Sequence, residues 1–142
     1  MTNQFQCPYP NHRLNERLRF LKYTTGNFFR PHYDGEFSTW QTREALKSRQ
    51  ASMGPEERSF IIYHLYLNSD DGLIGGATRI YSQNLKDGID IEAKQGRVLL
   101  FQHRDILHSG EDVYNGEKYT VRSDILYTKV EEPERNNEEW RR

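Results

Sequence analysis

Two histidines and one aspartate have the residue types and the spacing of a metal site. His32 and Asp34 are two positions apart on a segment with strand character, so both side chains project from one face, about 7 Å apart, and can converge on one ion. His108 follows the apolar segment 98–101 and supplies a third donor. Two imidazoles and one carboxylate form the facial triad of non-haem Fe(II) oxygenases, which leaves the opposite face of the ion open. An isolated His-x-Asp is more often a turn histidine bonded to its neighbour, so the pair needs support from the rest of the chain.

Two cations follow His108 on the last predicted strand. Lys118 comes ten residues after His108 and Arg122 fourteen after it, both on the polar face of segment 118–127. An oxygenase of this kind needs a co-substrate that gives two electrons to O₂, and 2-oxoglutarate does so while its 2-oxo acid chelates the metal. The distal carboxylate of 2-oxoglutarate then requires a fixed cation. The sequence leaves open whether Lys118 or Arg122 takes this role.

The three remaining histidines have weaker claims to the site. His64 lies in an apolar segment with alternation that points it inward, either as a core histidine or as a contact to the site. His103 comes five residues before His108 and competes weakly with it as third ligand, whereas His12 lies in a polar loop and is predicted to be exposed. Asp105 is either an ordinary loop residue or the carboxylate that orients the ring of His108.

Short β-strands are the elements that must position these residues. The chain is 35% hydrophobic and 13% aromatic, which favours half-buried strands over a helical bundle. Many short strands separated by turn residues are typical of a sandwich or barrel, so the sequence predicts a mainly β, jelly-roll fold with few short helices. The predicted strands are 17–23, 28–34, 60–67, 77–81, 89–93, 97–101 and 118–127, and helical turns are expected at 42–47 and, as an alternative to strand, at 14–19.

The length of 142 residues suits one compact domain but not two. We predict a single domain over residues 1–130, followed by a polar tail at 131–142 that is charged and nearly free of apolar residues. The strand pattern is lost over 35–58, directly after the His-x-Asp pair. A long excursion of this kind, which includes Trp40, is either a substrate lid over the metal or an ordinary surface insertion.

Composition and charge exclude several classes of protein. With 20 Lys+Arg against 21 Asp+Glu, the chain has no excess of positive charge for a phosphate backbone, so nucleic-acid binding is not indicated. No segment approaches the roughly 18 apolar residues of a membrane helix and no signal pattern is seen, so a cytoplasmic or nuclear protein without membrane contact is expected. The single cysteine, Cys7, excludes an intrachain disulfide and a thiolate zinc site. Any metal must therefore be held by imidazole and carboxylate.

Several short motifs occur in a fixed order within residues 17–128. They are Tyr-x-x-Gly, His-x-Asp, Tyr-Leu-Asn, Gly-Gly-x-Thr, the distal histidine and Gly-x-Lys, and their combination is far more specific than any single one. In these motifs the chain resembles the 2-oxoglutarate- and Fe(II)-dependent dioxygenases of the prolyl 4-hydroxylase type. The double-stranded β-helix of that family agrees with the jelly roll expected from strand spacing.

The resemblance implies a role for each matching residue. By it, His32, Asp34 and His108 hold Fe(II), and Lys118 matches the basic residue of the family ten positions after the distal histidine. Arg122 stays a candidate, because related oxygenases outside the family place an arginine further along. O₂ is the other co-substrate, and ascorbate is an optional reductant. Tyr23 and Tyr66 match positions that line the 2-oxoglutarate pocket, unless they are simply packed tyrosines, and Thr78 and Thr120 are weaker candidates.

The activity implied is hydroxylation of a C–H bond, with release of succinate and CO₂. A prolyl or other residue of a protein or peptide is the substrate that the resemblance implies. The fold does not determine the substrate, so the same chemistry on a small molecule or a nucleobase stays an alternative. A non-catalytic jelly-roll module that binds metal is the alternative from another class. The cations beside the triad argue against that module, because a structural metal has no need of a carboxylate clamp.

Overall fold

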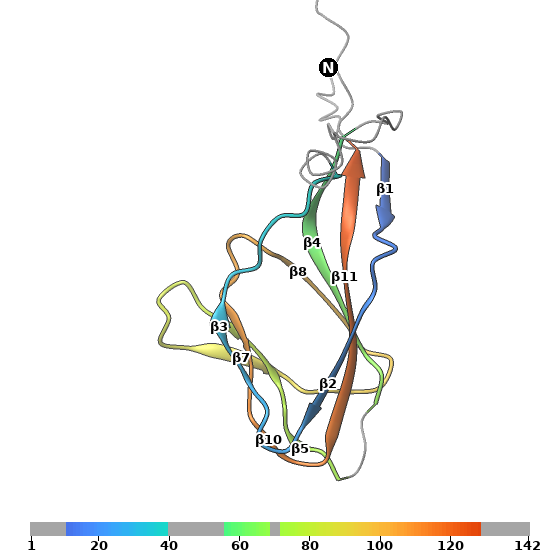
Figure 1. Cartoon of the computed structure of the whole chain (residues 1–142). Coiled ribbons are helices and arrows are strands. Elements are labelled where there is room, and N and C mark those ends of the chain that lie inside the picture. Colours follow the sequence, from blue (N-terminus) through green and yellow to red (C-terminus); the bar gives the residue numbers. More distant parts are fainter. Residues whose placement is uncertain (1–10, 40–55, 69–71, 129–142) are drawn as a thin grey trace, which may run out of the picture.

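The computed structural model describes residues 11–39, 56–68 and 72–128 of the chain. The regular elements of this part are β-strands, arranged in two main sheets and one short pair (Figure 1). In chain order the strands are β1 (Asn11–Leu14), β2 (Arg19–Thr24), β3 (Phe29–His32), β4 (Glu57–Tyr66), β5 (Ile74–Gly75), β6 (Thr78–Tyr81), β7 (Gly88–Ile91), β8 (Val98–Gln102), β9 (His108–Gly110), β10 (Val113–Asn115) and β11 (Glu117–Thr128).

The large sheet is built around β11, which is the longest strand. Along one edge β11 pairs antiparallel with β4, and β4 pairs in turn with β8. Along the other edge β11 pairs first with β2 and then with β1. Side chains alternate along β4, so that Ile62, His64 and Tyr66 are buried inside the fold. The inner face of this sheet therefore carries polar as well as apolar groups.

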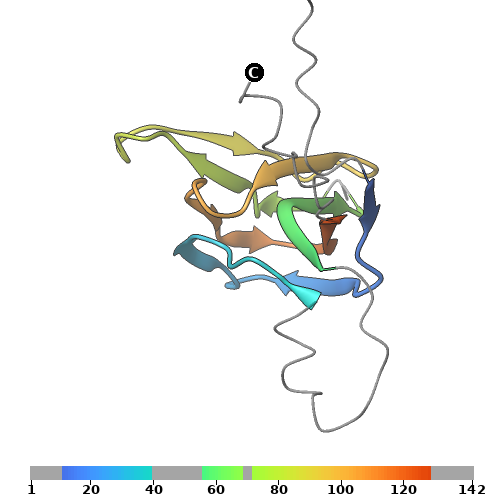
Figure 2. The ribbon, with the colours of Figure 1, turned by 90° about the horizontal axis from the view of Figure 1, so that it is seen from above.

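The small sheet has the strand order β3-β9-β6-β7, and β5 pairs with β10 beside it. Seen from above, the early strands lie along one side of the molecule and the β6–β7 hairpin lies on the opposite side (Figure 2). All strand pairs are antiparallel. This architecture confirms the mainly β, jelly-roll prediction, and it brings β3 and β9 opposite the inner face of β11.

The predicted strands agree with the observed ones to within a few residues, except that β3 ends at His32 and leaves Asp34 in the following loop. The short strands β1, β5, β9 and β10 were not predicted, because each is held by its partner and has too few residues to show a pattern. A helical turn at 14–19 does not form. Instead, the chain bends between β1 and β2, where the Asn15 N–H donates to the carbonyl of Asp124 over 2.8 Å. The helical turn expected at 42–47 lies outside the described residues.

Most of the expected lid at 35–58 and all of the expected tail at 131–142 also lie outside the described residues. The two described ends of the 35–58 stretch are held together. The Ser59 N–H donates to the carbonyl of Phe37 over 2.9 Å, and the Phe37 N–H donates to Ser59 Oγ over 2.8 Å. The chain therefore leaves and re-enters the described fold at one place, next to the loop that carries Asp34. No described helix is long and apolar enough to cross a membrane.

Candidate active site

The three residues of the predicted triad come together between the two sheets. His32 ends β3, His108 begins β9, and these two residues are paired across the strands. Asp34 lies just past β3, where its N–H donates to the carbonyl of His103 over 3.1 Å. One ligand atom of each triad residue lies within 4.8 Å of the other two. The side chains are thus close enough to bind one ion.

Each triad histidine is oriented by a backbone carbonyl. His32 Nδ1 lies 2.8 Å from the carbonyl oxygen of Arg30, and His108 Nδ1 lies 3.1 Å from that of Ile106. A carbonyl can only accept, so each Nδ1 carries the hydrogen, and the lone pair of each neutral ring is on Nε2. Of the two alternatives for Asp105, the orienting role is not the one found, because the carbonyl of Ile106 orients His108.

The two Nε2 lone pairs face the carboxylate of Asp34. Asp34 Oδ1 is 3.5 Å from His32 Nε2, and Asp34 Oδ2 is 3.3 Å from His108 Nε2. Oδ2 is buried and has no hydrogen-bond partner. Acceptors that converge in this way repel one another unless a cation lies between them, and imidazole with carboxylate is the donor set of non-haem iron. The residues therefore fit Fe(II).

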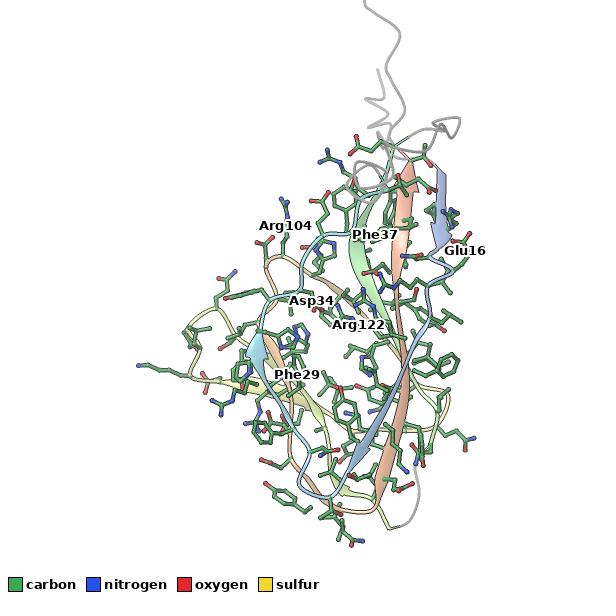
Figure 3. The ribbon with its side chains drawn as sticks, in the orientation of Figure 1. Glu16, Phe29, Asp34, Phe37, Arg104 and Arg122 are labelled. Carbon is green, nitrogen blue, oxygen red and sulfur yellow. The ribbon has the colours of Figure 1, made fainter. Side chains whose placement is uncertain are left out.

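Arg122 contacts the triad rather than standing apart from it. Its Nη2 lies 2.7 Å from Asp34 Oδ1, and the two side chains meet between the sheets (Figure 3). Burial alone would raise the pKa of Asp34, but the positive charge of Arg122 beside it lowers that pKa below its ordinary value. Asp34 is consequently a carboxylate at neutral pH, as a metal ligand must be.

Lys118 lies in the same cavity as the triad histidines, which has a volume of about 200 Å³. The side chain is only 2% exposed. Its Nζ donates to the carbonyl of Gly76 over 2.6 Å and lies 5.0 and 5.7 Å from the ring centres of Tyr23 and Tyr66. No carboxylate of the described residues pairs with Lys118. A buried ammonium without a counter-charge fits an anionic ligand such as the distal carboxylate of 2-oxoglutarate.

The Gly-Gly-x-Thr motif supports this end of the cavity. Gly76 has φ +69°, and a Cβ there would lie 3.1 Å from Val113 and 3.4 Å from the side chain of Lys118. Glycine thus allows its carbonyl to approach the ammonium closely. Thr78 Oγ1 accepts from the hydroxyl of Tyr66 over 2.8 Å. The two motif residues therefore hold Lys118 and Tyr66 in place.

Thr120 and His64 each carry a buried polar atom that has no hydrogen-bond partner among the described residues. Thr120 lies on the same strand as Lys118 and is fully buried, and its Oγ1 makes no hydrogen bond. His64 lines the cavity and its Nε2 is likewise unpaired. Burial lowers the pKa of His64 to about 3, with the charges of Lys118 and Arg122 acting in the same sense. His64 is therefore neutral, and its Nε2 is free to bond to a ligand in the cavity.

The other candidates take structural or peripheral places. His103 is 1% exposed, and its Nε2 lies 2.6 Å from the carbonyl of Ser59, so it packs against β4 and does not belong to the triad. His12 is exposed, as predicted, but it lies on β1 and not in a loop. Arg19 and Leu21 line the cavity but were not recognised from the sequence. Their even spacing from Tyr23 along β2 is the signal that places them on the same face.

The burial of Lys118 predicts a pH dependence of stability. Burial lowers the pKa of Lys118 to about 8, whereas the unfolded chain keeps a pKa near 10.4. Between these values the unfolded state binds more protons, so the free energy of unfolding of the cofactor-free protein should rise with pH, by about 3 kcal/mol at most. Denaturant unfolding from pH 7 to 10.5 measures this rise. It should disappear in Lys118→Met and persist in a variant of an exposed lysine, Lys86→Met; a rise that survives in Lys118→Met would contradict the assignment.

Comparison with protein families places the chain in a class. The family model of the 2OG-Fe(II) oxygenase superfamily matches residues 18–123, which include the whole triad, Lys118 and Arg122. The chain therefore belongs to the 2OG-Fe(II) oxygenase superfamily. Fe(II), 2-oxoglutarate and O₂ are the cofactor and co-substrates of this family. A comparison with curated proteins gives no match.

Solved prolyl hydroxylases share the fold. A prolyl-4-hydroxylase of Pseudomonas putida has a TM-score of 0.53 at 17% identity, with 87% of this chain covering 55% of that one. The collagen prolyl hydroxylase of Paramecium bursaria Chlorella virus 1, solved with 2OG, has 0.53 at 21%, with coverages of 86% and 64%. A Trichoplax adhaerens prolyl hydroxylase, solved with a hypoxia-inducible-factor peptide, has 0.52 at 18%, with coverages of 84% and 47%. The chain thus spans about half to two thirds of these structures.

Proposed function

We propose that this protein is a 2-oxoglutarate- and Fe(II)-dependent dioxygenase that hydroxylates a C–H bond of a protein or peptide residue, with proline as the first candidate. In this reaction one oxygen atom of O₂ enters the substrate as a hydroxyl group and the other enters succinate. 2-Oxoglutarate supplies two electrons and loses its C1 carboxyl group as CO₂. The observation that carries the proposal is that three metal donors converge, and that two of them, His32 and His108, share a cavity with a buried, unpaired lysine.

His32, Asp34 and His108 would hold the metal, and Fe(II) would supply the activation of O₂ when bound. The protein keeps these donors in position before any ligand arrives. The carbonyls of Arg30 and Ile106 set the ring orientation of the two histidines, and Arg122 orients the carboxylate of Asp34. All three donors come from one side, so the opposite side is left to co-substrates.

Lys118 would bind the distal carboxylate of 2-oxoglutarate. Arg122 would not bind this carboxylate and would pair with Asp34 instead. The two roles follow from the contacts that each cation already makes, because Arg122 is paired and Lys118 is not. Thr120 and the tyrosine pair Tyr23 and Tyr66 would complete the pocket. The tyrosine rings keep water from the ammonium, which strengthens its attraction for a carboxylate.

A peptide or protein substrate is supported by the three solved structures named above, which are prolyl hydroxylases and one of which holds a peptide. The expected lid at 35–58 would lie over the substrate, since both of its described ends join the fold beside Asp34. We place the enzyme in the cytoplasm or nucleus, where its lone cysteine stays reduced.

Production of succinate tests the proposal. Purified protein with Fe(II), 2-oxoglutarate and air should form succinate, and proline-containing peptides should increase the rate. A hydroxylated peptide, detected by a mass increase of about 16 Da, completes the assignment. Protein that binds metal and folds correctly but forms no succinate with any peptide, with or without ascorbate, would contradict the proposed activity.

A further inference from the structure

A second cavity adjoins the triad on the side of Asp34. It has a volume of about 310 Å³ and lies between the loop that follows β3 and the inner face of β11. Asp34 and Arg122 line it, and Figure 3 shows Phe37 of the same loop beyond them. A molecule in this cavity would therefore lie directly beside the metal donors. Its lining residues are Arg19, Asp34, Gly35, Glu36, Phe37, Ser38, Arg122 and Asp124.

Most charges around this cavity are already balanced within the protein. Asp34 pairs with Arg122 over 2.7 Å. Glu36 pairs with Arg104 over 2.7 Å and with Arg58 over 3.5 Å. Of the three carboxylates that line the cavity, only that of Asp124 has no ion pair with a described residue.

Asp124 is buried and has no partner. It lies two residues after Arg122, on the same face of β11, and is only 5% exposed. Its backbone carbonyl accepts a hydrogen bond from Asn15, but its carboxylate makes no hydrogen bond or ion pair with any described residue. Its oxygens are not among the fully buried unpaired atoms, so they face the cavity, where a carboxylate with little access to water gains from a cationic partner. A cation or a strong N–H donor that comes from outside the described fold would pair with the carboxylate of Asp124.

Arg19 is not the partner of the Asp124 carboxylate. It also lines the cavity but is exposed, and it makes no ion pair with Asp124. A solvated guanidinium needs no counter-charge, whereas a buried carboxylate does. The charge that remains unmatched in the cavity is thus negative, and it lies next to the place where a C–H bond would react.

We propose that Asp124 binds an ammonium or guanidinium group of the substrate, so that the hydroxylated site carries a basic group close by. This inference rests on the proposed function and narrows its substrate class. A lysine or arginine side chain of a peptide is one source of the cation, and a small basic metabolite is the other. Either would form a charge-assisted hydrogen bond with a carboxylate that has little access to water.

Matched peptides test the inference without changing the protein. Acetylated tetrapeptides with proline flanked on either side by lysine or arginine are compared with analogues that carry norleucine, and free lysine and arginine form a second arm. Calorimetry on the anaerobic protein with Fe(II) and 2-oxoglutarate should give about 10- to 100-fold tighter binding of the best basic peptide than of its norleucine analogue. Tighter binding of the free amino acids would support the same site with a small-molecule source. No preference for any basic ligand would overturn the proposal.

Variants then tie the preference to Asp124. Asp124→Asn keeps the shape of the side chain and removes its charge. The variant should therefore bind basic peptides at most about threefold more tightly than their norleucine analogues. Asp112→Asn, at an exposed position, is the matched control and should keep the preference. A preference that survives in Asp124→Asn would overturn the proposal. The absorption of the Fe(II)–2-oxoglutarate complex, measured on the same samples, reports separately on the proposed function.

Discussion

Replacing Asp34 with alanine is expected to weaken Fe(II) binding at least about 100-fold and to abolish succinate formation. The change removes one of three donors and also the counter-charge of Arg122, whose Nη2 lies 2.7 Å from Asp34 Oδ1. An unpaired guanidinium would then stand next to the metal position and repel the cation. Titration of the apo-protein with Fe(II) under anaerobic conditions measures the affinity.

The control for this experiment is Asp112→Ala, which removes an exposed carboxylate outside both cavities. His32→Ala and His108→Ala should behave like Asp34→Ala, and the exposed His12→Ala should behave like the unchanged protein. Fe(II) affinity within threefold of the unchanged protein in Asp34→Ala would show that the triad is assigned wrongly.

Replacing Lys118 with methionine is expected to raise the KM for 2-oxoglutarate about 100-fold, because a charge-assisted hydrogen bond in a buried site is lost. Methionine keeps the length and the apolar contacts of the side chain with Tyr23 and Tyr66. Fe(II) affinity without 2-oxoglutarate should change little, since Lys118 contacts none of the donors. Steady-state succinate formation against 2-oxoglutarate concentration measures the effect.

Lys22→Met is the matched control on the neighbouring strand, since Lys22 is exposed and pairs with Glu117. Its KM should stay within twofold of the unchanged protein. If Arg122→Gln instead raised the KM while Lys118→Met did not, the two cations would have the opposite roles, and Arg122 would be the carboxylate clamp.

The sequence predicted the residue types and the spacing of the candidate site, although it did not indicate Arg19 and Leu21. The triad types, the His-x-Asp spacing and the ten-residue step to Lys118 are all visible along the chain. The structure brings the three triad residues together and places Lys118 in the cavity that His32 and His108 line. The inward direction of His64 followed from strand alternation. Short-range periodicity and motif order carry this kind of information because they do not depend on the exact register of the sheets.

Contacts across the fold could not be predicted in the same way. The pairing of Arg122 with Asp34 depends on how far β3 and its loop reach toward β11, which no local pattern specifies. The carbonyls that orient His32 and His108 are backbone groups and leave no trace in residue type, which is why Asp105 was considered for that role. The unmatched charge of Asp124 emerges only after every neighbouring ion pair is known.

The strands likewise differ in whether a local sequence pattern predicts them or only tertiary pairing defines them. The long strands β4 and β11 were predicted closely, because each is long enough to show alternation. The two-residue strand β5 exists through its pairing with β10, and β9 through its place between β3 and β6. Since β9 carries His108, one metal donor stands on an element that only tertiary pairing defines.

The most direct test of the central claim is the absorption spectrum of the protein mixed with Fe(II) and 2-oxoglutarate in the absence of O₂. If His32, Asp34 and His108 hold Fe(II) and Lys118 holds the co-substrate, a weak visible charge-transfer band should appear, and it should be lost in Asp34→Ala. Folded protein that shows no band at saturating Fe(II) and 2-oxoglutarate would contradict the account.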